Sequence, residues 1–154
     1  MLIIVCGLQG TGKTSVAKKI ASKIEGILLR TDVIRKEIIK KPTYSEEEKQ
    51  SVYDEMFSRA KELIEGGKDV ILDSTFAKKE NRDKAQEITK DFRIVETICP
   101  ENIVKERIEK RFEDESEAKF EHYLKYKQFF DSIKEKHSII DTSKDIDEQL
   151  EKFF

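Results

Sequence analysis

The N-terminal end constrains the fold more than any other part of the chain. An apolar, β-branched run, LIIVC at 2–6, leads directly into a glycine-rich stretch, GLQGTGKTS at 7–15. Apolar residues then return at helical spacing in SVAKKIASKI at 15–24. A run that is apolar throughout is typical of a strand buried on both faces. This order predicts a buried strand, a tight loop and a helix.

Further short apolar stretches along the chain predict four more strands, at 26–30, 69–73, 92–99 and 137–141. Helical patterns lie between and after them, at 45–66, 78–90, 101–112, 117–135 and 145–153. Strands that alternate with helices indicate a parallel sheet covered on both faces, with ligands bound beyond the carboxyl ends of the strands. At 154 residues the chain has the length of one domain with a real core. We therefore expect a single α/β domain over 1–154, with three α/β/α layers and a five-stranded parallel sheet.

The amino-acid composition limits the kinds of partner and the cellular compartment that we expect for this protein. The 30 Lys and Arg nearly balance the 32 Asp and Glu, so a nucleic-acid partner is possible but not favoured by charge. Cys6 and Cys99 are too few and too far apart for a disulfide framework or a metal site, and are expected to be thiols in a reducing compartment. The N-terminal apolar run is too short for a signal peptide or a membrane span. We expect a cytoplasmic protein without a membrane partner, either a monomer or a small homo-oligomer.

Residues 7–14 fit the phosphate-binding pattern G-x-x-x-x-G-K-[ST] in full, between a predicted strand and a predicted helix. Glycines let backbone N–H groups turn inward around phosphate oxygens, and the helix N-terminus adds its positive dipole end. The pattern predicts a P-loop NTPase fold in which Lys13 reaches the β- and γ-phosphates and the Thr14 hydroxyl binds Mg²⁺. The residues expected to bind the nucleotide are Gly7, Gln9, Gly10, Thr11, Gly12, Lys13, Thr14 and Ser15. Asp73 ends a predicted strand and is expected to hold a magnesium-bound water; its alternative is a strand-end turn residue.

The phosphoryl group of such a site passes either to water or to a hydroxyl. A guanine-nucleotide switch needs N-K-x-D and D-x-x-G, and neither pattern occurs in the sequence. Hydrolytic motors place an acid directly after the aspartate of the third-strand motif, whereas Ser74 and Thr75 follow Asp73. Ring-forming ATPases also carry a helical lid domain for which the chain has no room. A hydroxyl acceptor is favoured, and an ATPase or an ATP-binding regulatory module is the alternative.

Four segments together resemble the small P-loop kinases of the predicted ATP-dependent kinase group. They are GLQGTGKT at 7–14, RTDVIRKEI at 30–38, DVILDSTFAKKENRDKA at 69–85 and CPENIVKERIEKRFEDESEA at 99–118. That group is similar to polynucleotide 5'-hydroxyl kinases, zeta-toxin-type kinases, gluconate and chloramphenicol kinases, and the kinase of seryl-tRNA. The resemblance covers nearly the whole chain. It implies an ATP- and Mg²⁺-dependent phosphotransferase whose acceptor is an alcohol of a small molecule, a nucleotide or a nucleic-acid 5' end.

The resemblance also assigns roles on the acceptor side. In the polynucleotide-type kinases a D-x-x-R after the second strand supplies a base and an arginine that holds the acceptor, which here are Asp32 and Arg35. The alternative is that Asp32 caps a helix beginning near Val33 and pairs with Arg35 at i, i+3. Thr75 and Arg82 match acceptor-side positions of the same kinases, although Arg82 is equally well a solvated helix residue.

A short helical lid is expected at about 107–125. Arg107 and Arg111 share one side of a helix, and lid arginines of the resembling kinases meet charge that develops on the transferred group. The alternative is a salt-bridged helix surface. The lid also carries acidic residues, which count against a long polynucleotide and favour a short acceptor or a small metabolite: Glu113, Asp114, Glu115 and Glu117.

Aromatic residues near these segments have less specific interpretations. Tyr44 is either an acceptor-side residue or the residue that precedes a helix cap at Ser45, and the cap is favoured. The stripe of Phe120, Tyr123, Leu124 and Phe130 is expected to pack in the core or the lid rather than stack on a base.

Overall fold

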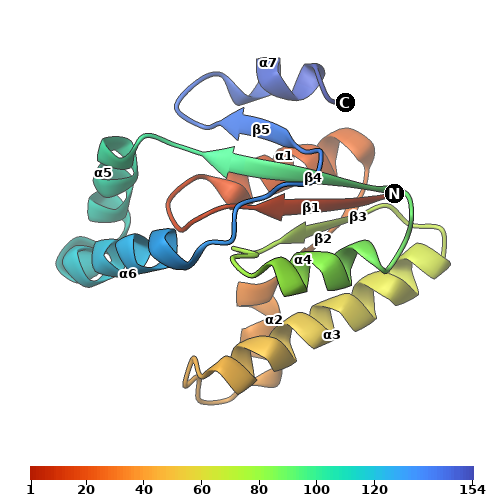
Figure 1. The fold of residues 1–154 in the computed structure, drawn as a ribbon, viewed down its shortest axis with the longest axis horizontal. Coiled ribbons are helices and arrows are strands. Elements are labelled where there is room, and N and C mark those ends of the chain that lie inside the picture. The colour runs from red at the N-terminus through yellow and green to blue at the C-terminus, as the bar shows by residue number, and fades with distance from the viewer.

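A single parallel sheet of five strands forms the centre of the molecule in the computed structural model (Figure 1). The structure describes residues 1–154, apart from the side chain of Ala118. The spatial order is β2-β3-β1-β4-β5, and all neighbouring strands pair in parallel. Their bounds are β1 Leu2–Cys6, β2 Ile27–Arg30, β3 Val70–Asp73, β4 Phe92–Ile98 and β5 Ser138–Asp141. These bounds confirm the five predicted strands.

Seven α-helices and one short 3-10 helix connect and flank the strands described here. They are α1 Lys13–Ile24, α2 Thr31–Ile38, α3 Glu46–Glu65, α4 Lys79–Gln86, α5 Glu101–Phe112, η1 Glu113–Glu115, α6 Ser116–Phe129 and α7 Ile146–Glu151. α4 and α6 end earlier than predicted. After α6 the backbone becomes extended at Phe130, and the Asp131 N–H donates to the Ala77 carbonyl at 2.8 Å. This tertiary contact replaces the helical bond that periodicity alone predicts.

The three layers follow from the alternation of side chains along β1. Every residue of β1 is buried, and successive side chains point to opposite faces of the sheet. Ile3 and Val5 pack with α1 and α7, whereas Leu2, Ile4 and Cys6 pack with α2, α3 and α4. Figure 1 shows the two groups of helices on opposite sides of the sheet. The expected three-layer α/β/α architecture is confirmed.

A third, smaller apolar cluster lies at the carboxyl ends of the strands, where α5 and α6 pack against each other. Its buried members are Val104, Ile108 and Tyr123, with Leu8, Phe112 and Phe120 packed around them. In Figure 1 this helix pair extends from the end of the sheet to which the strand arrows point. The cluster joins the pair to the glycine-rich loop through Leu8. No helix in the described part of the chain is long and apolar enough to cross a membrane.

Candidate active site

The glycine-rich loop joins the end of β1 to the start of α1 and is already folded around a concave turn. Gly10 and Gly12 have φ angles of 81° and 86°, in the left-handed region that favours glycine. Gly12 occupies the N-cap position of α1, so the helix dipole points at the loop. A Cβ at Gly10 would lie 2.9 Å from Val104 Cγ1, which shows how closely the loop packs on α5. Gln9 is half-buried in the loop, and Ser15 is exposed in the first turn of α1.

Two loop residues predicted to bind the nucleotide use their donors inside the protein. The Thr11 side chain is buried; its hydroxyl donates to the Leu8 carbonyl at 2.5 Å and lies 2.9 Å from Thr97 Oγ1. The Thr11 N–H also donates to Leu8, at 3.2 Å, and the Gly7 N–H donates to the Thr75 carbonyl at 3.2 Å. Both N–H donors therefore have partners within the loop and its neighbour, and nucleotide binding by these two residues stays a prediction.

Lys13 lies at the start of α1 with its ammonium directed back over the loop. Its Nζ donates to the Leu8 carbonyl at 3.2 Å. Burial lowers the pKa of Lys13 below its ordinary value, while the carboxylates of Asp73 and then Asp32 act in the opposite direction. The positive charge of Arg111 adds to the lowering of that pKa. Charged groups from three separate elements, β3, α2 and α5, thus act on one ammonium.

Thr14 and Asp73 form the pair predicted to bind a metal. Thr14 Oγ1 donates to Asp73 Oδ2 at 2.7 Å, and the Asp73 side chain is only 4% exposed. Two hard oxygen donors at the edge of a phosphate-binding loop fit Mg²⁺, which is usually held by one or two protein oxygens together with substrate phosphates and water. Among the described residues, no three or more His, Cys, Asp or Glu side chains are grouped so that they could hold a metal ion.

Arg30 is a site residue that sequence reasoning missed. Its Nε donates to Asp73 Oδ2 at 3.2 Å, and its Nη2 donates to Thr14 Oγ1 at 3.3 Å. The strand register pairs Arg30 directly with Asp73, each as the last residue of its strand. The position of an arginine at the end of a predicted strand was a usable signal, but its partner depends on which strand is the neighbour.

Asp32 and Arg35 lie on the first two turns of α2, which follows Arg30 directly. The helix begins at Thr31, with Arg30 in the N-cap position, so the alternative in which Asp32 caps the helix is wrong. The pairing at i, i+3 is confirmed, with Arg35 Nη1 3.4 Å from Asp32 Oδ1. The Asp32 side chain is 75% exposed. The site thus has an exposed carboxylate whose charge acts on the Lys13 ammonium.

The loop after β3 is held by a buried tyrosine of α3. Ser74 Oγ donates to Tyr53 Oη at 2.7 Å, and the Phe76 N–H donates to the same oxygen at 3.0 Å. Burial raises the pKa of Tyr53 to about 12, so this phenol is neutral over the ordinary pH range. These bonds fix the backbone of Thr75 beside Gly7, whose N–H donates to the Thr75 carbonyl, and the acceptor-side role of Thr75 stays a prediction.

Arg82 does not take the acceptor-side position that the sequence suggested. Its side chain is 0% exposed, and the guanidinium donates to the carbonyls of Phe76 at 2.7 Å and Asp131 at 2.8 Å. It also lies over the Phe130 ring, 5.6 Å from the centroid. Arg82 therefore joins α4 to the segment after α6, and its burial excludes both a solvated surface role and direct contact with an acceptor in this structure.

The two lid arginines have different surroundings. Arg107 donates to Thr142 Oγ1 and to the Thr142 carbonyl, each at 2.8 Å, while Thr142 Oγ1 donates to the Thr11 carbonyl at 2.7 Å. Arg107 thus links α5 to the phosphate loop through the turn after β5, a connection that the sequence did not indicate. Arg111 is exposed, next to the Phe112 ring.

Comparison with known proteins supports the fold assignment. A sugar kinase from Janibacter sp. HTCC2649 superposes with a TM-score of 0.77 at 16% identity, covering 99% of this chain and 91% of that one. The APS kinase of Mycobacterium tuberculosis, in complex with AMPPNP and APS, gives 0.78 at 20% identity, covering 99% and 94%. A gluconokinase from Sinorhizobium meliloti gives 0.73 at 19% identity, covering 97% and 86%.

Sequence comparison places the chain in a family. A search of curated proteins found no match. The polynucleotide-kinase and zeta-toxin side of the expected resemblance is not shown by these comparisons. The family model AAA_33, described as an AAA domain, matches residues 2–133. The chain therefore belongs to the AAA_33 family.

Proposed function

We propose that the protein is an ATP-dependent phosphotransferase that moves the γ-phosphate of ATP to a hydroxyl of a small molecule. The observation that carries this proposal is the placement of Asp32. Its exposed carboxylate lies at the start of α2, close enough to Lys13 for its charge to oppose the lowering of the pKa of that ammonium by burial, and it pairs with Arg35. A carboxylate beside the phosphate loop has the position of a base for a second substrate.

The proposed roles follow the geometry of the site. Lys13 and the N-terminus of α1 bind the phosphates, and Thr14 with Asp73 hold Mg²⁺, which supplies positive charge to the β- and γ-phosphate oxygens when bound. Asp32 orients the acceptor hydroxyl and accepts its proton. The hydroxyl oxygen forms a bond to the γ-phosphorus while the bond to the β–γ bridging oxygen breaks, and ADP leaves. Arg35 holds the acceptor, and Arg111 neutralises charge on the transferred group from the α5–α6 lid.

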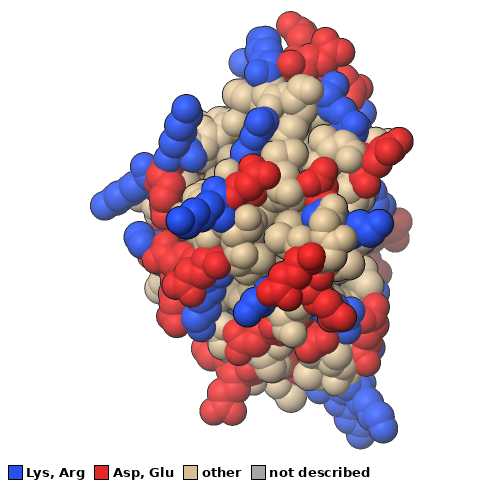
Figure 2. All heavy atoms as spheres, turned by 90° about the vertical axis from the view of Figure 1, so that its right-hand side faces the viewer, with Lys and Arg blue, Asp and Glu red and all other residues tan. Residues whose placement is uncertain are grey.

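A small acceptor is supported by the charge distribution and by the structural neighbours. Glu113, Asp114, Glu115 and Glu117 are exposed where α5 meets α6, and they repel the phosphates of a long polynucleotide. Figure 2 shows the side of the molecule away from the strand ends that carry the site, and on that side basic and acidic side chains are interspersed rather than gathered into a basic stripe. The neighbours are named as a sugar kinase, a gluconokinase and an APS kinase, and these names point to small-molecule substrates.

Hydrolysis by an AAA-type ATPase is the second candidate, favoured by the family description as an AAA domain. Against it, the residue after Asp73 is Ser74, whose hydroxyl donates to Tyr53 and which supplies no carboxylate for activating water.

The deciding experiment measures ADP release from γ-labelled ATP with Mg²⁺, with and without acceptors. The panel contains D-gluconate and other sugar acids, sugars, nucleosides, 5'-hydroxyl oligonucleotides and seryl-tRNA. Strong stimulation by a small alcohol, with the label recovered on it, is the expected result. Steady ADP release that no acceptor changes, with all label in inorganic phosphate, contradicts the proposal and supports the ATPase.

A further inference from the structure

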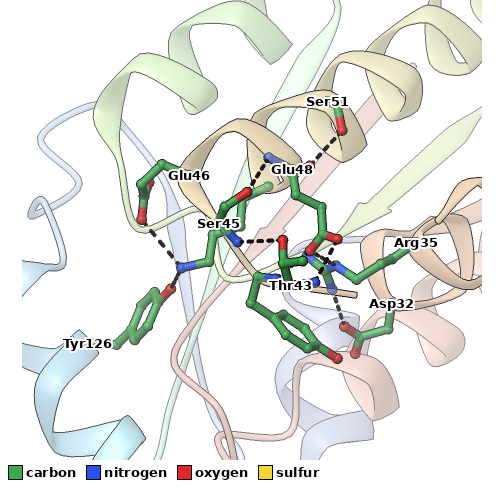
Figure 3. A network of polar contacts seen from close by, with 10 residues as sticks. Asp32, Arg35, Thr43, Ser45, Glu46, Glu48, Ser51 and Tyr126 are labelled. Atoms are coloured by element: carbon green, nitrogen blue, oxygen red, sulfur yellow. Dashed lines mark hydrogen bonds and ion pairs between the residues drawn. The ribbon is translucent and has the colours of Figure 1, made fainter. Parts of the chain in front are cut away.

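Glu48 is a buried carboxylate that the proposed chemistry does not use. It lies in the first turn of α3, and its side chain is only 7% exposed. Its two oxygens accept the N–H groups of Thr43 at 2.9 Å and Tyr44 at 2.6 Å, while its own N–H donates to Ser45 Oγ at 3.2 Å (Figure 3). One side chain thus fixes the backbone of the connector that leads from α2 into α3.

The same carboxylate faces Arg35. Glu48 Oε2 lies 4.0 Å from Arg35 Nε, and that Nε is buried without a hydrogen-bond partner among the residues that the structure describes. At its other end the guanidinium points toward Asp32, the proposed base, as Figure 3 shows. Arg35 therefore lies between two carboxylates, and the buried one is fixed by its backbone bonds.

Tyr44 completes this arrangement from the connector. The Arg35 guanidinium lies over the Tyr44 ring, 5.0 Å from the centroid, which is within the range of a cation–π interaction. Tyr44 has a φ of 55° and its side chain is 58% exposed. The left-handed backbone costs a residue with a Cβ about 1–2 kcal/mol. The bond from its N–H to Glu48 offsets that cost and keeps an aromatic ring at the surface against Arg35.

We propose that Glu48 is a positioning residue for the acceptor, and that Arg35 and Tyr44 together form the surface that receives it. The inference rests on the proposed phosphotransferase function. The Arg35 side chain is 13% exposed, and this exposed part offers donors to an anionic group of the acceptor. The exposed part of the Tyr44 ring offers a flat apolar surface to the carbon skeleton of the acceptor. The favoured acceptor is an anionic alcohol with a ring or another apolar face. Glu48 acts only through the two residues that it holds.

The competing explanation is that Ser45 and Glu48 form a capping box that only starts α3. A matched control is available in Glu47, an exposed glutamate of the same helical turn. Glu47→Gln removes the same charge from the helix N-terminus and leaves the Glu48 contacts intact. Differences between Glu48→Gln and Glu47→Gln therefore report the contacts and not the helix dipole.

The first test measures positioning without an acceptor. The chain contains no Trp, so Tyr44→Trp introduces the sole tryptophan at the connector. In that background we expect Glu48→Gln to raise the acrylamide quenching constant about 1.5-fold, because position 44 is already 58% exposed and local opening of the connector exposes only the remainder. Glu47→Gln leaves the constant unchanged. Equal quenching in the two variants overturns the positioning role of Glu48.

The second test measures acceptor use, with D-gluconate and the other acceptors of the panel. Glu48→Gln and Tyr44→Leu should each raise the acceptor KM about tenfold, equivalent to about 1.4 kcal/mol, with the KM for ATP within twofold of wild type. Tyr44→Phe should restore the low acceptor KM. Parallel rises in both KM values, or a loss of Tm with unchanged KM values, overturn the proposal in favour of the capping box.

Failure of the proposed function has a separate signature. If wild-type protein transfers phosphate to no member of the panel, the phosphotransferase assignment fails and the acceptor role of Tyr44 fails with it. The quenching comparison is unaffected by that result and decides the positioning role alone.

Discussion

Arg30 and Asp73 are the last residues of two neighbouring parallel strands, and Arg30 Nε lies 3.2 Å from Asp73 Oδ2. Asp73 is nearly inaccessible to water, so this ion pair balances a carboxylate that burial would otherwise destabilise. Arg30 also donates to Thr14, the other proposed metal ligand. One arginine therefore fixes the geometry of both oxygens proposed to hold Mg²⁺.

Arg30→Gln should destabilise the nucleotide-free protein by about 1–3 kcal/mol, because it leaves a buried carboxylate without its charged donor. Urea unfolding measures the change. Arg59→Gln is the control, since Arg59 pairs with Glu37 and Glu55 at the surface, where such pairs contribute about 0–1 kcal/mol. Unfolding of the two variants at the same urea concentration would show that the Arg30–Asp73 pair contributes no more to the free energy of unfolding than a surface pair.

Lys13→Met should stabilise the nucleotide-free protein while abolishing ATP binding. Burial lowers the pKa of Lys13 in the folded state, so the unfolded chain binds more protons, and the charged ammonium costs stability at neutral pH. We expect a gain of about 1 kcal/mol, or about 2–4 °C in Tm.

The pH dependence of that gain tests its cause. The penalty in wild type is fully present below the lowered pKa and is relieved as the pH rises toward the ordinary value of 10.5. The difference in Tm between Lys13→Met and wild type should therefore shrink with rising pH. Lys18→Met, an exposed change on the same helix, should show no such trend.

Asp32→Asn should reduce acceptor phosphorylation by about 10²–10⁴-fold, because the amide cannot accept the hydroxyl proton. The Kd for ATP, measured by calorimetry, should stay within twofold of wild type, since Asp32 is proposed to act on the acceptor and not on the nucleotide. Asp54→Asn, an exposed change on α3, controls for lost surface charge. Full phosphorylation by Asp32→Asn would remove Asp32 from the chemistry.

Gly10→Ala and Gly67→Ala separate backbone strain from close packing. Both glycines have left-handed φ angles, 81° and 79°, which cost alanine about 1–2 kcal/mol. A Cβ at Gly10 also meets Val104 Cγ1 at 2.9 Å, whereas a Cβ at Gly67 meets no described atom within 4 Å. Gly10→Ala should therefore lower the free energy of unfolding, measured in urea, by about 1–3 kcal/mol more than Gly67→Ala does. It should also weaken ATP binding. Equal losses would contradict the close packing of the loop on α5.

The sequence by itself determined the strands and the phosphate loop. A strand covered on both faces is a continuous apolar run, and Gly7, Gly10 and Gly12 end the first run where the chain must turn, so the signal lies within a few neighbouring residues. The strand bounds, the three layers and the closeness of Thr14 to Asp73 were all predictable from such local patterns. The helix Thr31–Ile38 was foreseen only as an alternative, because its eight residues give a weak periodic signal.

Only the tertiary structure decided which partners the charged residues have. Arg82 belongs to a polar helix, yet its guanidinium is buried against carbonyls of Phe76 and Asp131. Arg107 and Arg111 share one helical side, but only Arg107 reaches Thr142. Arg35 finds Glu48 across a connector that no short pattern describes. Periodicity shows which side of a helix a residue occupies, whereas a charge takes its role from the group that the fold brings opposite to it.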